Sequence, residues 1–199
     1  MRILQDRSLL AWSLDCAGDS RYVDKIAIVT NDARAAETAH GLSLSIISEP
    51  EAEDREQQVW FARSALKALF EVRGYDLVVV LDTGSPFKLS TDIDTCIEIC
   101  ARNDGSPVVS VSESTSPASD WHYLGSDRAM KPVFSKDDNN KDERRLYRLN
   151  RAIMAMSKNL LCRDKSFITE QTRAFIMPLE RSLYINNKTG LSMGIGLFG

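Results

Sequence analysis

The chain has 199 residues, of which 43% are apolar and 27% are charged, and its formal net charge at pH 7 is −3. This length suits one domain with a buried core, and the composition is that of a folded protein rather than a disordered chain. The acidic balance disfavours a general nucleic-acid-binding role, which needs a surplus of basic residues, but it leaves room for a small anionic substrate.

The sequence has no obvious membrane or export segment. No stretch reaches the roughly 18 apolar residues of a membrane-spanning helix, and the charged start MRILQDRSLL does not resemble a signal peptide. We therefore expect a cytoplasmic protein without membrane contact. The four cysteines, Cys16, Cys96, Cys100 and Cys162, lack zinc-ribbon spacing, so we expect reduced core residues rather than metal ligands.

Alternating helices and apolar strands predict the fold class. In chain order we expect a helix over 8–17, a strand over 25–30, a helix over 33–40, a strand over 44–47, a helix over 55–72, a strand over 77–81, a helix from 90 to 102, and strands over 107–111 and 174–177. The run 77–81 is expected to be buried on both faces of its sheet. This order predicts a single α/β domain, residues 1–199, with a largely parallel sheet and right-handed crossovers.

Residues 112–145 interrupt the alternation. This segment is polar, has two small apolar islands at 121–124 and 130–134, and shows no helix period. We expect a β-ribbon or a long excursion from the sheet. Its charge run, 136–145, is expected to be a solvated face, with a mobile lid or a dimer arm as the alternative.

The polar turn after strand 77–81 is the candidate site. It reads Asp82-Thr83-Gly84-Ser85-Pro86, and open α/β sheets place ligands at the carboxyl ends of their strands. Asp82-Thr83-Gly84-Ser85 also matches the active-site signature of aspartic proteases, in which two such loops share a proton. That fold is all-β, whereas helices are predicted on both sides of this motif, so a dimeric protease is a remote alternative.

A series of short motifs resembles the acylneuraminate cytidylyltransferases, the family that activates nonulosonic acids as CMP-sugars. LLAWS at 9–13 resembles the family's PLIAWS, VTND at 29–32 its STDD turn, LDTGSPFK at 81–88 its LQPTSPLR, PVVSV at 107–111 its SVVSV strand, YRLNRAI at 147–153 its YRxNGAI, and MPLERS at 177–182 its last-strand motif. The matches follow the family's order over essentially the whole chain.

This resemblance implies a Rossmann-like sheet of the nucleotide-diphosphosugar transferase type, CTP and an acidic sugar as substrates, Mg²⁺ as cofactor, and a homodimer. It implies attack by a sugar hydroxyl on the α-phosphate of CTP with pyrophosphate leaving, a reaction that depends on positioning and charge neutralisation. At the matching positions, it implies that Asp82, Ser85, Asn150 and Asp32 line the nucleotide pocket and that Arg148 supplies a cation for an anionic group.

Several family positions carry other residues here. Where the family has SIDIDT, this chain has SLYINN, so Tyr184 and Asn186 stand at the two metal-binding aspartates. Asp82 replaces the glutamine of LQPTSP, and Arg151 replaces the glycine of YRxNGAI. A phenol and a neutral amide supply no negative charge, so metal affinity is expected to fall steeply.

The family's first strand and Gly-rich basic loop precede its PLIAWS motif and have no counterpart in this sequence. In the family that strand lies mid-sheet, between the strands expected here at 25–30 and 77–81. Without it, these two strands would carry unpaired backbone groups. We expect that the two strands close on each other, that another segment fills the gap, or that the natural chain begins upstream.

Two functional hypotheses follow. The first is a cytidylyltransferase that transfers CMP from CTP to a sugar acid. The second is a catalytically inactive or truncated relative that acts as a binding or oligomerisation module.

Overall fold

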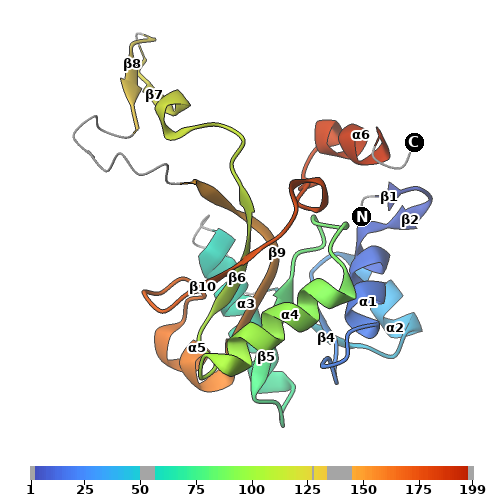
Figure 1. Cartoon of the computed structure of the whole chain (residues 1–199). Helices are drawn as coiled ribbons and strands as arrows, with labels where there is room; N and C mark the ends of the chain where they lie inside the picture. Colours follow the sequence, from blue (N-terminus) through green and yellow to red (C-terminus); the bar gives the residue numbers. More distant parts are fainter. Residues whose placement is uncertain (1–2, 50–56, 127, 134–144, 197–199) are drawn as a thin grey trace.

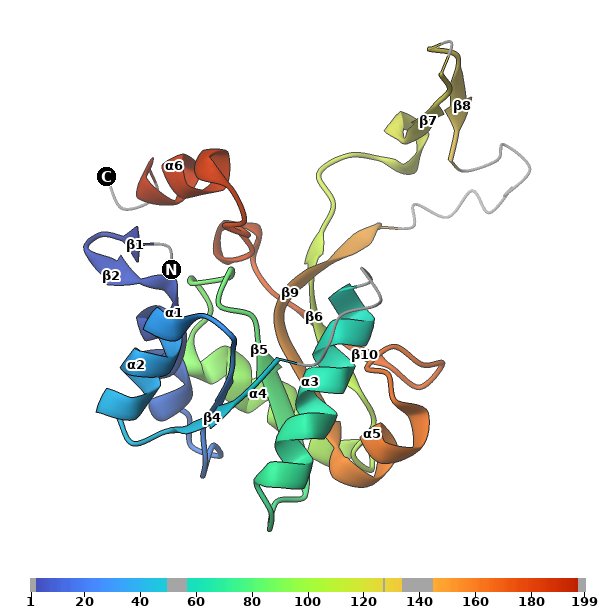
Figure 2. The same ribbon diagram turned by 180° about the vertical axis from the view of Figure 1, so that it is seen from behind.

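The computed structural model describes residues 3–49, 57–126, 128–133 and 145–196. Its main sheet has four strands in the order β10-β6-β9-β5, which are β10 (Arg173–Ile176), β6 (Val108–Glu113), β9 (Tyr147–Ser157) and β5 (Leu77–Leu81). β10 is parallel to β6, whereas β9 runs antiparallel to both β6 and β5. Helices lie on both faces of this sheet (Figures 1 and 2), which confirms the expected α/β fold class.

A second, two-stranded parallel sheet consists of β3 (Ala27–Val29) and β4 (Ser45–Ile47). Within the described ranges, β3 pairs only with β4, and β5 pairs only with β9. The two sheets therefore do not close on each other, and no described segment fills the gap between them. Every residue of β5 remains partly exposed. The prediction that this strand is buried on both faces is wrong, because one of its edges lies along a cavity.

Two helical layers bury the core of the main sheet. Helix α4 (Ser90–Arg102) packs on one face, where Ile93 and Cys96 contact the Ile153 region of β9. Helices α3 (Gln57–Glu71) and α5 (Lys158–Asp164) cover the other face, where Phe61 and Leu161 are buried. Cys96 and Cys100 are core residues as expected, whereas Cys16 is half-buried and Cys162 is exposed.

Three helices have a capping side chain at their N-terminus. Ser8 Oγ accepts a hydrogen bond of 3.1 Å from Ala11 N at the start of α1 (Leu9–Gly18). Asp32 Oδ1 accepts bonds from two backbone N–H groups at the start of α2 (Ala33–Gly41), and Ser157 caps α5. These bonds pair N–H groups of the first turn that the helix itself leaves unpaired.

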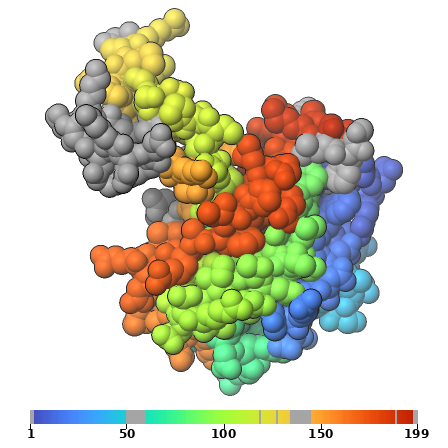
Figure 3. Space-filling view, in the orientation of Figure 1, coloured from blue at the N-terminus to red at the C-terminus, as the bar shows by residue number. Residues whose placement is uncertain are grey.

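The chain between β6 and β9 extends away from the main body (Figure 3). Its described part contains a 3-10 turn, η1 (Ala118–Asp120), and a hairpin of β7 (His122–Leu124) with β8 (Met130–Pro132). This is the β-ribbon expected within 112–145. The charge run 136–145 lies outside the described residues except for Arg145.

The two ends of the described chain lie near each other (Figure 1). Strands β1 (Ile3–Leu4) and β2 (Arg7–Ser8) form a small hairpin, and Leu4 packs with Ile185 and Leu191. The C-terminal part contains η2 (Leu179–Arg181) and α6 (Lys188–Gly196). No helix among the described residues has the length and apolar character needed to cross a membrane.

Gly105 should be required for the junction between α4 and β6. Its φ is 75°, and a Cβ there would lie 2.4 Å from Ser157 Cβ. Because both the left-handed backbone and the contact oppose a side chain, Gly105→Ala should lower the free energy of unfolding by about 2–4 kcal/mol. Gly18→Ala is the matched control, because no atom lies within 4 Å of a Cβ at this helical position.

The control should leave the free energy of unfolding unchanged or raise it by about 0.5–1 kcal/mol. Urea unfolding of both variants measures the two values. Equal effects of the two substitutions would contradict the close packing inferred at Gly105.

Candidate functional site

Three segments that are far apart in the sequence meet at the carboxyl end of β5. They are the turn that begins at Asp82, the part of β9 around Asn150, and the segment that contains Tyr184. Ser85 Oγ donates a hydrogen bond of 3.4 Å to the Asn150 carbonyl oxygen, and Ile185 N donates one of 2.7 Å to the Gly84 carbonyl oxygen. This is the sheet edge where open α/β folds place ligands.

The turn is held by its own polar groups. Asp82 Oδ1 accepts a hydrogen bond of 2.7 Å from Gly84 N, and the Asp82 carbonyl oxygen accepts one of 3.2 Å from Ser85 N. Gly84 is buried, and a Cβ there would lie 2.5 Å from Cε2 of Tyr184. A glycine is therefore needed here because the tyrosine ring packs directly on the turn.

Lys88 fixes the turn from inside the protein. Its side chain is 1% exposed, and Nζ donates hydrogen bonds to Ser13 Oγ (2.9 Å), the Asp82 carbonyl oxygen (2.9 Å) and the Ser85 carbonyl oxygen (2.8 Å). These three bonds use all three ammonium protons and connect α1 to the turn. Burial lowers the pKa of Lys88 to about 8, against the opposing charge of Asp82.

The motif LDTGSPFK ends at Lys88, but the sequence analysis gave this lysine no role. One signal was available, because Lys88 is the only charged residue between Asp82 and Asp92. A single charged residue in an otherwise neutral turn can be either exposed or buried, so only the structure shows that the Lys88 side chain is buried.

A buried polar cluster supports the site from below. Asn150 is 4% exposed, and its Oδ1 accepts hydrogen bonds from Ser110 Oγ (2.5 Å) and Ala152 N (3.2 Å). Its Nδ2 donates to Ser182 Oγ at 2.9 Å. Ser85 is fully buried as well. The structure thus brings Asn150 and Ser85 together, but both side chains are buried and bonded to other protein groups. They support the site from within and do not form its surface.

Arg151 and Tyr184 form the exposed face of the site. The guanidinium carbon of Arg151 lies 5.5 Å from the centre of the Tyr184 ring, a cation–π arrangement. Arg151 has a φ of 64°, in the left-handed region that favours glycine. The backbone thus keeps the conformation expected at the glycine of the YRxNGAI motif, although an arginine now occupies it.

Two of the predicted site residues lie apart from this cluster. Arg148 is exposed on β9, toward the excursion, and its Nε donates a hydrogen bond of 3.3 Å to Ser112 Oγ. Asp32 follows β3, on the other sheet, and its carboxylate caps α2. The bonds from the backbone N–H groups of Ala35 and Arg34 lower the pKa of Asp32. The structure does not bring Asp32 to the turn at Asp82.

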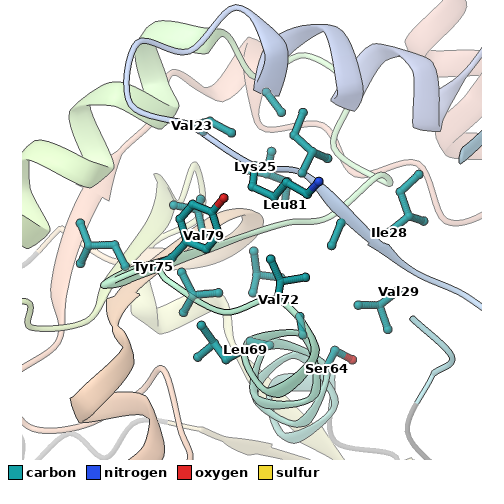
Figure 4. Close-up of a pocket in the computed structure, with 18 of the residues that line it drawn as sticks. Val23, Lys25, Ile28, Val29, Ser64, Leu69, Val72, Tyr75, Val79 and Leu81 are labelled. Atoms are coloured by element: carbon teal, nitrogen blue, oxygen red, sulfur yellow. The ribbon is translucent and has the colours of Figure 1, made fainter. Parts of the chain in front are cut away.

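A cavity of about 550 Å³ separates β3 from β5 (Figure 4). Its walls are residues of these two strands together with the facing sides of α1 and α3, and most of them are apolar. None of the predicted site residues lines it, namely Asp32, Asp82, Ser85, Arg148 and Asn150. Thr83 is the one residue of the polar turn that lines the cavity, so the cavity ends at the turn.

The donor set at the turn does not fit Mg²⁺. Magnesium prefers anionic oxygen ligands, whereas Tyr184 and Asn186 stand at the positions that the resemblance assigns to aspartates. The guanidinium over the Tyr184 ring adds positive charge at the same place. Across the described ranges, no group of three or more His, Cys, Asp or Glu side chains is arranged to hold a metal ion. We therefore derive no chemical step through a metal here.

No family model matches the chain. Among curated proteins, it is 25% identical over 198 residues to N-acylneuraminate cytidylyltransferase of Escherichia coli O18:K1:H7 (strain RS218 / NMEC). The match covers 97% of this chain and 46% of that protein, so the chain spans about half the length of this relative. The resemblance drawn from the sequence motifs is thereby confirmed.

Two solved structures share the fold. The structure of CMP:2-keto-3-deoxy-manno-octonic acid synthetase complexed with CTP aligns with a TM-score of 0.72 at 10% identity, over 99% of this chain and 90% of that one. 4-Diphosphocytidyl-2C-methyl-D-erythritol synthase from Anaerococcus prevotii DSM 20548 aligns with a TM-score of 0.68 at 12% identity, over 98% and 88%. At these identities the likeness establishes a shared Rossmann-like fold alone.

The buried ammonium predicts a pH-dependent stability. The pKa of Lys88 is about 8 in the folded protein, against an ordinary value of 10.5. Between these pH values the unfolded chain binds more protons, so the contribution of Lys88 to the free energy of unfolding rises with pH. Lys88→Met removes this rise. Urea unfolding from pH 7 to pH 10 should therefore show the wild type gaining stability relative to the variant.

At pH 7, Lys88→Met should also lower the free energy of unfolding by about 2–4 kcal/mol, because three buried oxygens lose their donor. Lys131→Met, on the exposed strand β8, is the control and should follow the wild-type pH curve. Parallel curves for the wild type and Lys88→Met would show that the ammonium does not titrate in this range.

Two substitutions at Arg151 separate backbone strain from stacking. Arg151→Ala removes the stacking on Tyr184 but keeps a side chain at positive φ, so it should cost about 0.5–1 kcal/mol. Arg151→Gly also relieves the strain and should be more stable than the alanine variant by about 1 kcal/mol. Urea unfolding measures both differences.

Arg63, exposed within α3, is the control position. Within a helix the order should reverse, with the glycine variant about 1 kcal/mol less stable than the alanine variant. The same order at both positions would argue against a left-handed backbone at Arg151.

Proposed function

We propose that this chain, a relative of the cytidylyltransferases, has a cytidylyltransferase-type function in which CTP is the nucleotide and an acidic sugar is the acceptor. The observation that carries the proposal is the sequence similarity over 198 residues to N-acylneuraminate cytidylyltransferase. The polar turn after β5 supports it, because this is where folds of this class bind their ligands.

In the proposed reaction, an acceptor oxygen forms a bond to the α-phosphorus of CTP while the bond from that phosphorus to pyrophosphate breaks. The hydroxyl proton of the acceptor is released to solvent. Such a transfer needs the two reactants held in line and the phosphate charge neutralised. Arg148 and Arg151 are exposed on β9 and suit this role, because a guanidinium group binds phosphate or carboxylate with two parallel hydrogen bonds. Lys88 is buried and serves the turn instead.

A second function is favoured by one contact. Tyr184 packs on Gly84, and the Arg151 guanidinium lies over the Tyr184 ring. The resemblance implies an aspartate in place of Tyr184 and a glycine in place of Arg151. This arrangement offers a cation to an anionic ligand but no carboxylate to a metal. The second candidate is therefore a catalytically inactive relative that binds a cytidine nucleotide or an acidic sugar.

The α/β fold argues against the remote alternative of an aspartic protease. Asp82-Thr83-Gly84 lies between strand β5 and helix α4, whereas the protease signature belongs to an all-β fold. Homodimer formation stays part of the proposal, with the excursion 112–145 as its contact. Exposed apolar side chains on the β7–β8 hairpin, Tyr123, Leu124 and Met130, support this assignment.

Thermal unfolding with CTP tests nucleotide binding. CTP at about 100 times its Kd should raise the Tm of the chain by about 5–10 °C, and ATP should raise it less. Arg148→Ala should lose this shift because the variant lacks the cation for the phosphates. Arg102→Ala, which removes an exposed arginine at the end of α4, should keep it. An unchanged CTP shift in Arg148→Ala would refute the role of that residue.

Pyrophosphate release then distinguishes the two candidates. Release that requires both CTP and an acidic sugar, such as N-acetylneuraminic acid, supports transfer. A CTP shift without release supports the inactive relative. A cooperative unfolding transition that responds to neither CTP nor the sugar contradicts both candidates.

A further inference from the structure

The exposed face of the site carries a guanidinium group where the resemblance implies a metal ion. The guanidinium carbon of Arg151 lies 5.5 Å from the centre of the Tyr184 ring, and this ring packs directly on Gly84 of the polar turn. An arginine that stacks on an aromatic ring presents a planar set of N–H donors, which match the oxygens of a phosphate or a carboxylate. The pair therefore suits an oxyanion.

The backbone at Arg151 sets this position apart from the rest of β9. The register between β6 and β9 shifts between Val109 and Val111, which marks a bulge. Arg151 lies on β9 opposite this shift, between Leu149 and Met154, and its φ is 64°. Bulges redirect side chains, and backbone strain of this kind is retained mainly at functional sites. The strained position and the exposed charge thus coincide.

The other charged groups of the turn offset each other. Asp82 contributes a carboxylate, whose Oδ1 accepts a hydrogen bond of 2.7 Å from Gly84 N. Lys88 contributes a buried ammonium group, which donates to the Asp82 and Ser85 carbonyl oxygens. Burial lowers the pKa of Lys88 to about 8 and the Asp82 charge opposes this shift, so Lys88 is mainly protonated at pH 7. Arg151 adds its positive charge to a turn whose own charges balance.

The same face is a poor site for a divalent cation. A Cβ at Gly84 would lie 2.5 Å from Tyr184 Cε2 and 3.1 Å from Asp82 Oδ1, so the ring and the carboxylate flank one point. Asn186, two residues after Tyr184, carries a neutral amide. Within the ranges that the structure describes, no three His, Cys, Asp or Glu side chains gather as metal ligands. A guanidinium beside a single carboxylate repels Mg²⁺ and attracts an anion.

We propose that the Arg151–Tyr184 pair binds the phosphate chain of the ligand without a divalent cation. The Arg151 guanidinium neutralises the phosphate charge, and the Tyr184 ring holds the guanidinium over the turn. A metal-free triphosphate carries more negative charge than its magnesium complex, so it is the preferred form. The inference rests on the proposed function, which supplies CTP as the ligand, and it reverses the cofactor requirement that the resemblance implies.

Calorimetric titration with two probes tests the inference. One probe is CTP, and the other is inorganic tripolyphosphate, which has the phosphate chain without the nucleoside. Both should bind the wild-type chain in EDTA. Replacing EDTA with excess MgCl₂, at an ionic strength matched with NaCl, should weaken the binding of both probes by about three- to tenfold, because Mg²⁺ removes negative charge from the phosphates.

Substitutions at Arg151 test the cation. Arg151→Ala should weaken the binding of both probes in EDTA by about 10- to 100-fold. Arg151→Gly should lose as much, although a left-handed backbone favours glycine, so instability does not explain the loss. Arg151→Lys keeps the charge without the planar donors and should retain part of the affinity. Arg102→Ala, at the exposed end of α4, is the matched control and should bind as the wild type does.

Substitutions at Tyr184 and Asp82 test the two groups beside the cation. Tyr184→Leu removes the ring and should weaken metal-free binding by about two- to fivefold, whereas Tyr184→Phe keeps the ring and should bind more tightly than the leucine variant. Asp82→Asn keeps an oxygen acceptor for Gly84 N but removes a negative charge, so it should tighten metal-free binding by about two- to fivefold. A site that held Mg²⁺ through Asp82 would instead lose affinity in MgCl₂.

Three results would overturn the inference. They are no binding of either probe in EDTA, binding that Mg²⁺ strengthens, and wild-type affinity in Arg151→Gly. Failure of the proposed function is a separate outcome. Tripolyphosphate that binds without a metal while CTP does not bind would support the phosphate site and contradict CTP as the ligand. CTP that binds only with Mg²⁺ would support the proposed function and overturn this inference.

Discussion

The buried ammonium of Lys88 holds together the part of the molecule where ligands are expected. Removing a charged amine from water is costly, and three oxygens from α1 and the turn offset that cost. With the turn fixed, Gly84 can accept both the Tyr184 ring and the Ile185 backbone. A second, partly buried contact secures the opposite side, because Arg181 Nη1 donates to Asp92 Oδ2 at 2.7 Å and ties the segment before Tyr184 to α4. The geometry of the site thus depends on two cations, the buried Lys88 and the partly buried Arg181.

Much of the fold could be predicted because each element carries a local signal. The apolar run of β5, the caps of α1 and α2, and the alternation of strands with helices all lie in contiguous stretches of sequence. Strand direction has no such signal. β9 is antiparallel to its neighbours because the chain returns from a long excursion, and its apolar residues look the same in either direction. The exposure of β5 could not be predicted for a related reason. It arises because, among the described residues, no strand pairs with the edge of β5 that faces away from β9, and the sequence of β5 itself carries no signal of this.

The sequence motifs identified segments that meet in the structure, but not the contacts between them. The motif that contains Asp82 and Ser85 and the motif that contains Asn150 do meet, because both lie at the same edge of one sheet. Their roles differ from the expectation because remote serines engage the Asn150 amide, and no spacing rule relates Ser110 or Ser182 to it. Asp32 belongs to the end of a strand too, but its strand lies on the far side of the cavity between β3 and β5. A sequence motif can identify the end of a strand, whereas only the three-dimensional structure shows which ends are neighbours.

The cavity between β3 and β5 is continuous with the polar turn. β5 forms one wall of this cavity and leads directly into Asp82, and Thr83 lines the end of the cavity. Among the described residues, β5 is paired on one side only, and a strand with one unpaired edge opens more readily than a strand paired on both sides. The two bonds from Lys88 to the carbonyl oxygens of Asp82 and Ser85 therefore fix the turn at the end of a strand that is itself held on one side only.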